Sequence, residues 1–195
     1  MDTAMNDITL RDARPEDCHA IAQLFLISSD GLAEYVWSRM DAPGLSPAEI
    51  GARRYAREGV PFSYQNCIMA ERGGTVVGMA HSYPMEASDD ADPESDPVLQ
   101  PYAELEDAGS LYLSALALLP DHRNRGIGTR LLESVHAQAR ARGLPRVSLI
   151  CMEPNEGAMR LYRRHRYVET ARRAIVPHPT LHYAEGDALL LVKTF

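Results

Sequence analysis

The feature that most constrains the fold is a glycine turn between an apolar segment and an amphipathic one. Residues 110–119, SLYLSALALL, are typical of a strand, and the turn RNRGIG follows at residues 123–128. A helix is predicted from Gly126 to about Arg142. Glycines at a helix start let a ligand approach the backbone closely, and the unpaired N–H groups there favour phosphate. The order of strand, turn and helix therefore predicts a pyrophosphate site.

The apolar residues on both sides of the turn indicate how the predicted strand and helix pack. The predicted helix has one apolar stripe, which suits packing on a sheet; it comprises Ile127, Leu131, Leu132, Val135 and Ala139. The strand is apolar on both faces, which places it centrally in a sheet. Small Ala115 and Ala117 leave two interpretations open, room for a ligand or a splayed neighbouring strand, or plain tight packing.

The rest of the chain alternates between predicted strands and helices, with no internal repeat and no sign of a second domain. Strands are predicted at 8–11, 66–71, 76–83, 146–152, 167–176 and 187–194, and helices at 15–28, 47–58 and 155–165. A loop region containing Gly31, Pro43 and Gly44 separates the first two helices. Residues 86–107 form an acidic, proline-containing insertion, interpreted either as a lid or as disordered, with a helical part near 98–105. We therefore expect one domain over residues 1–195.

Composition limits the classes of protein that this chain can be. Apolar residues make up 45% and charged residues 24% of the 195 residues, as in ordinary globular proteins. No apolar run approaches the roughly 20 residues that span a bilayer, so no membrane association is expected. The three cysteines lack metal-ligand spacing, which predicts reduced thiols, no metal and a cytoplasmic location.

The net charge of −7 argues against nucleic-acid binding, yet the charges are unevenly distributed. Residues 86–107 contain nine acidic residues and no Lys or Arg, whereas residues 120–173 contain twelve arginines and five acidic residues. The basic groups thus gather around the glycine turn, where an anionic cofactor would lie.

A second motif begins at Asn155, which is a good helix N-cap after Pro154. Tyr162 follows two helical turns later on nearly the same face, roughly 10 Å along the axis. An amide and a phenol on one face could line a groove for an extended chain, although Asn155 could also only cap and Tyr162 only pack. Placed one strand after a phosphate-binding turn, the pair points to coenzyme A.

Together these residues resemble the GCN5-related N-acetyltransferase (GNAT) family. LALLPDHRNRGIGTRLL is similar to the acetyl-CoA motif of the family, and NEGAMRLYRRHRYVE to the helix and strand that follow it. The specific resemblance covers residues 110–169, and the first 109 residues fit the family only in the order of their elements. It implies an α/β (α+β) fold with a mixed, mostly antiparallel, twisted sheet of about seven strands, splayed open at the cofactor site and flanked by about four helices.

The resemblance also implies roles for individual residues. Backbone N–H groups of the turn would hold pyrophosphate, Leu116 and Leu118 would pair with the amides of pantetheine, and Tyr162 would be the general acid. The predicted cofactor-binding residues are Leu116, Ala117, Leu118, Arg123, Asn124, Arg125, Gly126, Ile127, Gly128, Thr129, Asn155, Ala158 and Tyr162, and the predicted catalytic residues are Tyr162, Leu116 and Glu104.

The expected reaction is acetyl transfer from acetyl-CoA to an amine of a small molecule or a peptide. An N–H group near Leu116 would stabilise the developing oxyanion, and Tyr162 would protonate the departing thiolate. No base is equally clear, because the motif strand has Ser110, Tyr112 and Ser114 where many relatives have a glutamate. The alternatives that stay open are a carboxylate of Glu104, Glu106 or Asp107, a water chain, or a histidine. The histidines are His81, His178 and His182, and for each of them a solvent-exposed or core position is the favoured interpretation.

Two other functions stay open beside the enzyme. A catalytically weak acyl-CoA-binding or sensor module would fit the missing strand carboxylate. A nucleotide-phosphate-binding protein is disfavoured, since the chain lacks the Lys-Ser/Thr of a P-loop and the three-glycine dinucleotide pattern. The sequence identifies neither the amine acceptor nor the oligomeric state, so a homodimer stays open.

Overall fold

The computed structural model describes residues 7–87 and 94–195. These residues form two compact units, the first with residues 7–82 and 115–135 and the second with residues 83–114 and 136–195. Strand β4 (Leu111–Leu118) and helix α5 (Ile127–Ala141) each contribute residues to both units. The acidic residues at 89, 90 and 92 lie outside the described part of the chain.

The first unit contains β1 (Ile8–Asp12), β2 (Cys67–Arg72) and nearly all of β3 (Thr75–Pro84). These strands pair antiparallel in sequence order, with Ile8 opposite Arg72 and Cys67 opposite His81. The end of β4 follows β3 in the sheet, and Leu119 N–H donates to the carbonyl of Val77 at 2.9 Å. A Cβ at Gly78 would lie 2.7 Å from the carbonyl oxygen of Ala117, so only glycine permits this close approach.

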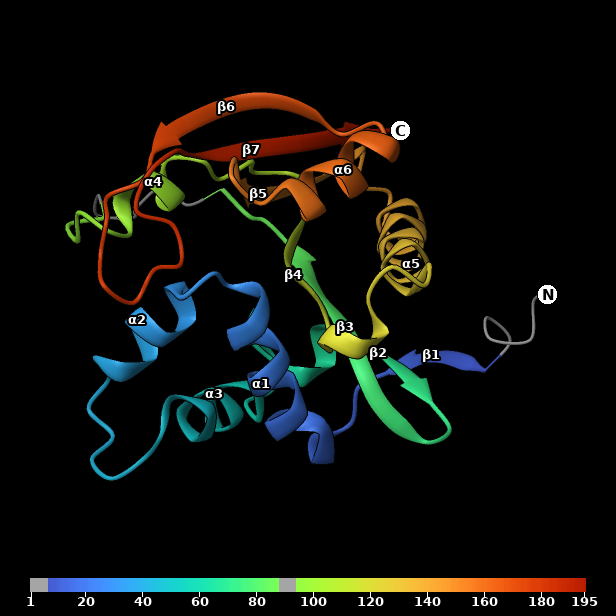
Figure 1. The fold of residues 1–195 in the computed structure, drawn as a ribbon. Coiled ribbons are helices and arrows are strands. Elements are labelled where there is room, and N and C mark those ends of the chain that lie inside the picture. Colours follow the sequence, from blue (N-terminus) through green and yellow to red (C-terminus); the bar gives the residue numbers. More distant parts are fainter. Residues whose placement is uncertain (1–6, 88–93) are drawn as a thin grey trace. The chain divides into compact units, whose positions relative to one another are not determined.

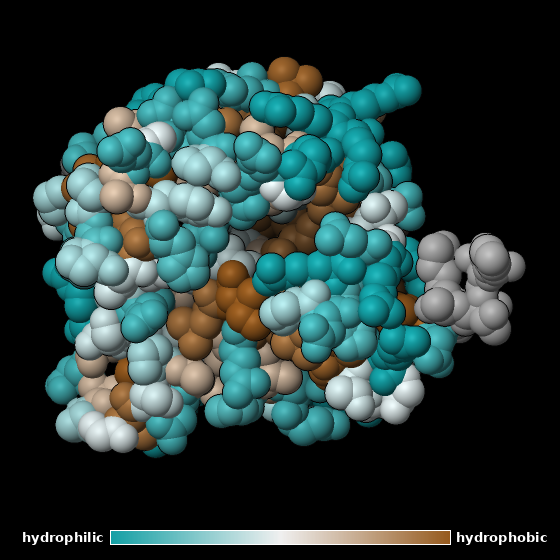
Figure 2. Space-filling model, in the orientation of Figure 1, coloured by the Kyte–Doolittle hydropathy of each residue, from teal (hydrophilic) through white to brown (hydrophobic). Residues whose placement is uncertain are grey.

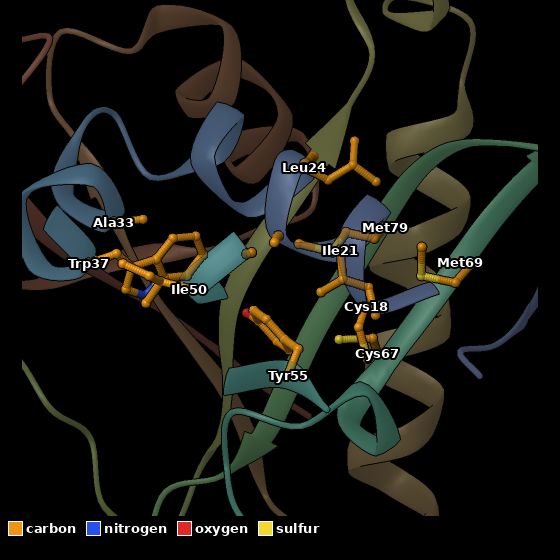
Figure 3. Close-up of a cluster of buried hydrophobic side chains, with 13 residues drawn as sticks. Cys18, Ile21, Leu24, Ala33, Trp37, Ile50, Tyr55, Cys67, Met69 and Met79 are labelled. Carbon is orange, nitrogen blue, oxygen red and sulfur yellow. The ribbon is translucent and has the colours of Figure 1, made fainter. Parts of the chain in front are cut away.

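Three helices of the first unit pack on one another, α1 (Cys18–Ser28), α2 (Leu32–Ser38) and α3 (Pro47–Tyr55). Helix α3 begins with a capping box, in which Ser46 and Glu49 satisfy each other's backbone N–H groups. Figure 3 shows the core beneath them, where side chains from α1, α2 and α3 meet those of β2 and β3. This core anchors the strands that precede the predicted cofactor turn.

Helix α2 is a difference from the sequence analysis, which expected a loop there. Its buried residues include Ala33, Tyr35 and Trp37, a spacing of two that does not indicate a helix. The helix is held by packing instead, since Trp37 stacks on Phe25 at 5.5 Å between ring centroids. Trp37 also fills the space that a side chain at Gly51 would need. These partners are distant in sequence, so no local pattern predicts the helix.

The second unit contains the start of β4 with β5 (Arg146–Met152), β6 (Val168–Ala174) and β7 (Asp187–Thr194). Strand β7 pairs antiparallel with β5 on one side and with β6 on the other. The helices are α4 (Gln100–Ala103) and α6 (Glu156–Arg164), together with the end of α5. In Figure 1 the paired β6 and β7 appear in orange and red. A core of Leu105, Met152, Ile175, Ala188 and Leu190 holds this unit together.

Strands β4 and β5 pair in parallel over a short stretch only. The register joins Leu111 with Val147 and Tyr112 with Ser148, after which the described residues of this unit show no further pairing between the two strands. Beside this pairing, the buried hydroxyls of Ser110 and Ser148 lie 2.6 Å apart. A short pairing at one end is what the predicted splayed sheet requires of these strands.

The described strands number seven and follow the order β1-β2-β3-β4-β5-β7-β6, a mixed sheet as predicted. The described α-helices number six, which are the four longer predicted helices, α4 within the helical part expected near 98–105, and the unpredicted α2. Figure 2 shows hydrophilic residues over much of the visible surface, with hydrophobic ones exposed among them. Among the described residues, no helix combines the length and the apolar character that crossing a membrane needs.

Candidate functional site

The end of β4 in the first unit presents two different faces. Ala115 and Ala117 are buried in the core of that unit, whereas Leu116 and Leu118 on the other face are only half-buried. Of the two interpretations left open for the alanines, the structure shows tight packing. The same packing fixes the backbone of Leu116 and Leu118, the residues predicted to pair with pantetheine.

The turn after β4 has the backbone conformation that its sequence predicts. A short 3-10 helix, Pro120–His122, leads into it, and the Arg123 side chain donates to the carbonyl of Leu118 at 3.3 Å. Asn124 and Gly126 have positive φ angles of 58° and 76°. These left-handed residues turn the chain sharply from strand to helix, and Asn and Gly are the residues that tolerate such angles best.

Helix α5 begins with backbone N–H groups that no helical carbonyl can accept. Arg130 N–H donates to the carbonyl of Gly126 at 3.2 Å, which is the first hydrogen bond of the helix. Ile127, Gly128 and Thr129 precede it, so their N–H groups have no carbonyl within the helix to donate to. The predicted stripe is buried, and Leu131, Leu132 and Val135 are completely inaccessible to solvent. This arrangement suits a phosphate group, because donors and dipole point at the same place.

In the second unit, Asn155 caps helix α6 as predicted. Its side-chain oxygen accepts a hydrogen bond from Ala158 N–H at 3.2 Å. This bond fixes the side chain of Asn155 and brings two predicted cofactor-binding residues together. Met159 and Tyr162 are buried on the same helix, at 5% and 8% exposure. The amide and the phenol therefore come from one rigid element.

Tyr162 packs against a buried pair that the sequence analysis missed. The ring of Tyr167 meets it edge to face at 5.5 Å, and the Tyr167 hydroxyl lies 2.9 Å from Nε2 of His136. Burial, with positive neighbours adding to it, lowers the pKa of His136 to about 4, so its imidazole is neutral at neutral pH. The only signal in the sequence was the position of His136 on the buried stripe of α5, one helical turn after Leu132.

Glu104, the predicted carboxylate base, forms an ion pair. Arg173 donates to its carboxylate at 2.6 Å and Gln100 donates to the other oxygen at 3.0 Å. The hydrogen bond from Arg173 lowers the pKa of Glu104, which makes the carboxylate a weaker proton acceptor. Asp107 is held by Arg146 through hydrogen bonds of 2.7 and 2.8 Å. These contacts weaken the case for either carboxylate as the base.

The histidines considered as bases have structural partners. His81 is fully buried, with Nε2 donating to the carbonyl of Pro61 at 2.9 Å and Nδ1 lying 3.1 Å from the Tyr55 hydroxyl. Burial lowers its pKa to about 4. Nδ1 of His178 lies 2.9 Å from the hydroxyl of Thr180 and accepts from its N–H at 3.3 Å. His81 is therefore a core histidine, the interpretation that the sequence already favoured.

Metal-ligand clusters are not found in the described residues. No group of three or more His, Cys, Asp or Glu side chains is placed there to hold a metal ion. All three cysteines are buried as free thiols, and burial raises the pKa of Cys67.

Three solved structures are similar to the whole chain. One is the apo form of an agmatine N-acetyltransferase variant, at 19% identity and a TM-score of 0.68, covering 97% of this chain and 100% of that one. Another is yncA from Salmonella typhimurium with its cofactor acetyl-CoA, at 18% identity and a TM-score of 0.62. That likeness covers 97% of this chain and 94% of yncA. Naa50 from Arabidopsis thaliana, in complex with a bisubstrate analogue, has 16% identity and a TM-score of 0.61, covering 97% and 99%. At such identities these likenesses show a common fold.

Family membership follows from the sequence itself. No curated protein matches the chain. The model of the acetyltransferase (GNAT) family matches residues 33–167, which is well over half of the chain and extends through parts of both units. The match includes the glycine turn, the start of α5, the cap of α6 and Tyr162. The chain therefore belongs to the acetyltransferase (GNAT) family.

Proposed function

We propose that the protein transfers an acetyl group from acetyl-CoA directly to an amine of a small molecule or a peptide. The observation that carries the proposal is the start of α5, where the N–H groups of Ile127, Gly128 and Thr129 precede the first helical hydrogen bond. A left-handed Gly126 leaves the turn without a side chain at this point. Accessible backbone N–H donors at a helix N-terminus are the groups that bind a pyrophosphate.

Further residues are proposed to contact the rest of the cofactor. Backbone groups of Leu116 and Leu118, with Ala117 between them, would pair with the amides of pantetheine. In the second unit, Asn155 and Ala158 would contact the other part of the arm. Arg123 and Arg125 are exposed at the turn, and their charges favour an anionic ligand. The proposal also keeps one domain over residues 1–195, which the family match over residues 33–167 supports.

The chemistry would be direct attack of an amine on the thioester in a ternary complex. Aligning the two reactants supplies much of the acceleration, ~7–11 kcal/mol in the ideal case. A backbone N–H near Leu116 would stabilise the oxyanion, and Tyr162 would protonate the departing thiolate. Glu104 stays the proposed carboxylate base, although its pairing with Arg173 weakens it, and a water chain is the alternative.

Several solved structures support an amine acceptor without identifying it. One similar protein is an agmatine N-acetyltransferase, which is named for a small cationic amine, and Naa50 is bound to a bisubstrate analogue. A cytoplasmic location is also proposed, and the three free cysteines support it.

An assay of released CoA thiol tests the proposal. Acetyl-CoA is mixed with the protein and a panel of amines that includes polyamines, amino acids, aminoglycosides and peptide N-termini. We expect thiol release that depends on one class of acceptor. Calorimetric binding of acetyl-CoA, ATP and NAD is measured in parallel. Tight binding of acetyl-CoA without acceptor-dependent release would instead favour the acyl-CoA sensor, which the absence of a carboxylate on β4 allows.

A further inference from the structure

The three carboxylates closest before β4 in the sequence are those of Glu104, Glu106 and Asp107. Two of them form salt bridges in the structure and one does not. Glu104 is paired with Arg173 and Asp107 with Arg146. Glu106 lies between them in the sequence, is exposed, and forms no salt bridge with any residue of the described chain. Its negative charge is therefore the uncompensated one at this end of β4.

The backbone around Glu106 is anchored on both sides. Leu105 is completely buried in the core of the second unit. On the other side, the Asp107 carbonyl accepts from the Ser110 hydroxyl at 2.7 Å, while its carboxylate is held by Arg146. The backbone of Glu106 is therefore held between two fixed neighbours, and its side chain extends from a constant position of the chain.

The segment that carries Glu106 is hydrogen-bonded to the chain just after Tyr83, because Gly109 N–H donates to the carbonyl of Met85 at 2.8 Å and Met85 N–H donates to the carbonyl of Ser110 at 2.9 Å. Tyr83, at the end of β3, meets Tyr112 of β4 edge to face, with ring centroids 5.6 Å apart and planes at 69°. Burial raises the pKa of Tyr83 to about 12 and that of Tyr112 beyond its usual range, and the charge of Glu106 adds to both effects. The carboxylate is thus within electrostatic reach of both phenols.

Tyr112 is partly exposed to solvent, and its hydroxyl group is not hydrogen-bonded to any described residue. Enough protein nevertheless surrounds it to raise its pKa. A phenol in such surroundings usually has a partner. It lies on the half-exposed face of β4 that also carries Leu116, the predicted oxyanion residue.

A carboxylate beside two tyrosine rings suits one class of ligand. An ammonium group gains from the negative charge and from the electron-rich ring faces, whereas an anion is repelled. We propose that Glu106, Tyr83 and Tyr112 form a subsite for a second cationic group of the acceptor, so that the preferred substrate is an alkyl amine with a further positive charge. The inference rests on the proposed acetyl transfer and names its substrate class.

Two matched amines test the subsite by binding. Calorimetry with 1,4-diaminobutane and n-butylamine, with and without saturating CoA, compares ligands that differ by one ammonium group. We expect the diamine to bind more tightly to the wild-type protein. Glu106→Gln should weaken diamine binding about fivefold, the upper range for an exposed ion pair, and leave n-butylamine unchanged. Glu86→Gln is the matched control, because it removes one charge from the same acidic insertion and should bind both amines like wild type.

Other outcomes would overturn the subsite. If Glu86→Gln weakens the diamine as much as Glu106→Gln does, the acidic insertion acts only through its general field. If the wild-type protein binds both amines equally, no second cationic group is recognised. Thiol release measured on the same samples separates this inference from the proposed function. Selective diamine binding without any release would leave the subsite standing and reject acetyl transfer, whereas equal loss of release with both amines in Glu106→Gln would make Glu106 part of proton transfer instead.

Discussion

At the scale of single residues, the glycines of the turn have separable tasks. Gly126 has a φ of 76°, so valine there adds backbone strain to the loss of open access, whereas Gly128 lies within the first turn of α5. We expect both Gly126→Val and Gly128→Val to weaken acetyl-CoA binding by at least about tenfold, because the side chain blocks approach to the N–H groups. Calorimetry measures the affinity, and thermal unfolding controls for stability. Wild-type affinity in the folded Gly128→Val variant would show that the pyrophosphate lies elsewhere.

Tyr162 gives a second test at this scale. Its ring is held by Tyr167 and by the buried side of α6, so replacing it with phenylalanine removes only the hydroxyl. Turnover by Tyr162→Phe should fall by roughly 10²–10⁴, the usual contribution of general acid catalysis, while acetyl-CoA affinity stays near normal. Steady-state kinetics with thiol detection gives the number. A turnover number equal to that of wild type would leave the tyrosine a packing residue.

At the scale of elements, His81 joins three parts of the first unit. It sits on β3, donates to the carbonyl of Pro61 and lies within hydrogen-bond distance of Tyr55 at the end of α3. Because the carbonyl can only accept, Nε2 carries the proton and Nδ1 accepts from the tyrosine. Protonating the ring would turn Nδ1 into a second donor, which its partner does not suit as well.

A pH dependence of stability follows from this geometry. The folded-state pKa of His81 is lowered to about 4, mainly by burial, so its stabilisation is complete above pH ~6.5 and is lost as the pH falls toward 4. The free energy of unfolding should drop between pH 7 and 5, by at most about 1.4 kcal/mol per pH unit for this group. Urea unfolding of wild type and His81→Gln measures it. The variant should show a shallower drop, and equal slopes would contradict the assignment.

At the scale of the whole molecule, the local charge near each ligand should affect binding more than the net charge of the protein does. The chain carries −7, yet residues 120–173, which include the glycine turn, contain twelve arginines and five acidic residues, and residues 86–107 contain nine acidic residues and neither Lys nor Arg. Acetyl-CoA and a cationic amine should therefore both bind more weakly as salt rises, since the Debye length shrinks from about 30 Å at 0.01 M to about 8 Å at 0.15 M. Calorimetry over this range tests it. If salt strengthens acetyl-CoA binding, the net negative charge governs the cofactor.

Much of the site could be predicted because its signals are local. The turn, the stripe of α5 and the cap by Asn155 depend on residues within a few positions of one another, and the structure confirms each of them. Helix α2 could not be predicted, since Trp37 finds its partners in Phe25 and Gly51. The pair of His136 and Tyr167 was missed for the same reason.

The sequence by itself determined the order of the strands and of the four longer helices, the glycine turn and the family, since spacing and side-chain type suffice for these. Only the tertiary structure decided which charges are neutralised. Glu104 pairs with Arg173, which is 69 residues away in the sequence, and Asp107 pairs with Arg146, which is 39 residues away. Two of the three carboxylates before β4 are therefore neutralised by an arginine. Glu106 forms no salt bridge with any residue of the described chain. Such contacts depend on how strands and loops are brought together in space, and no local pattern along the chain encodes them.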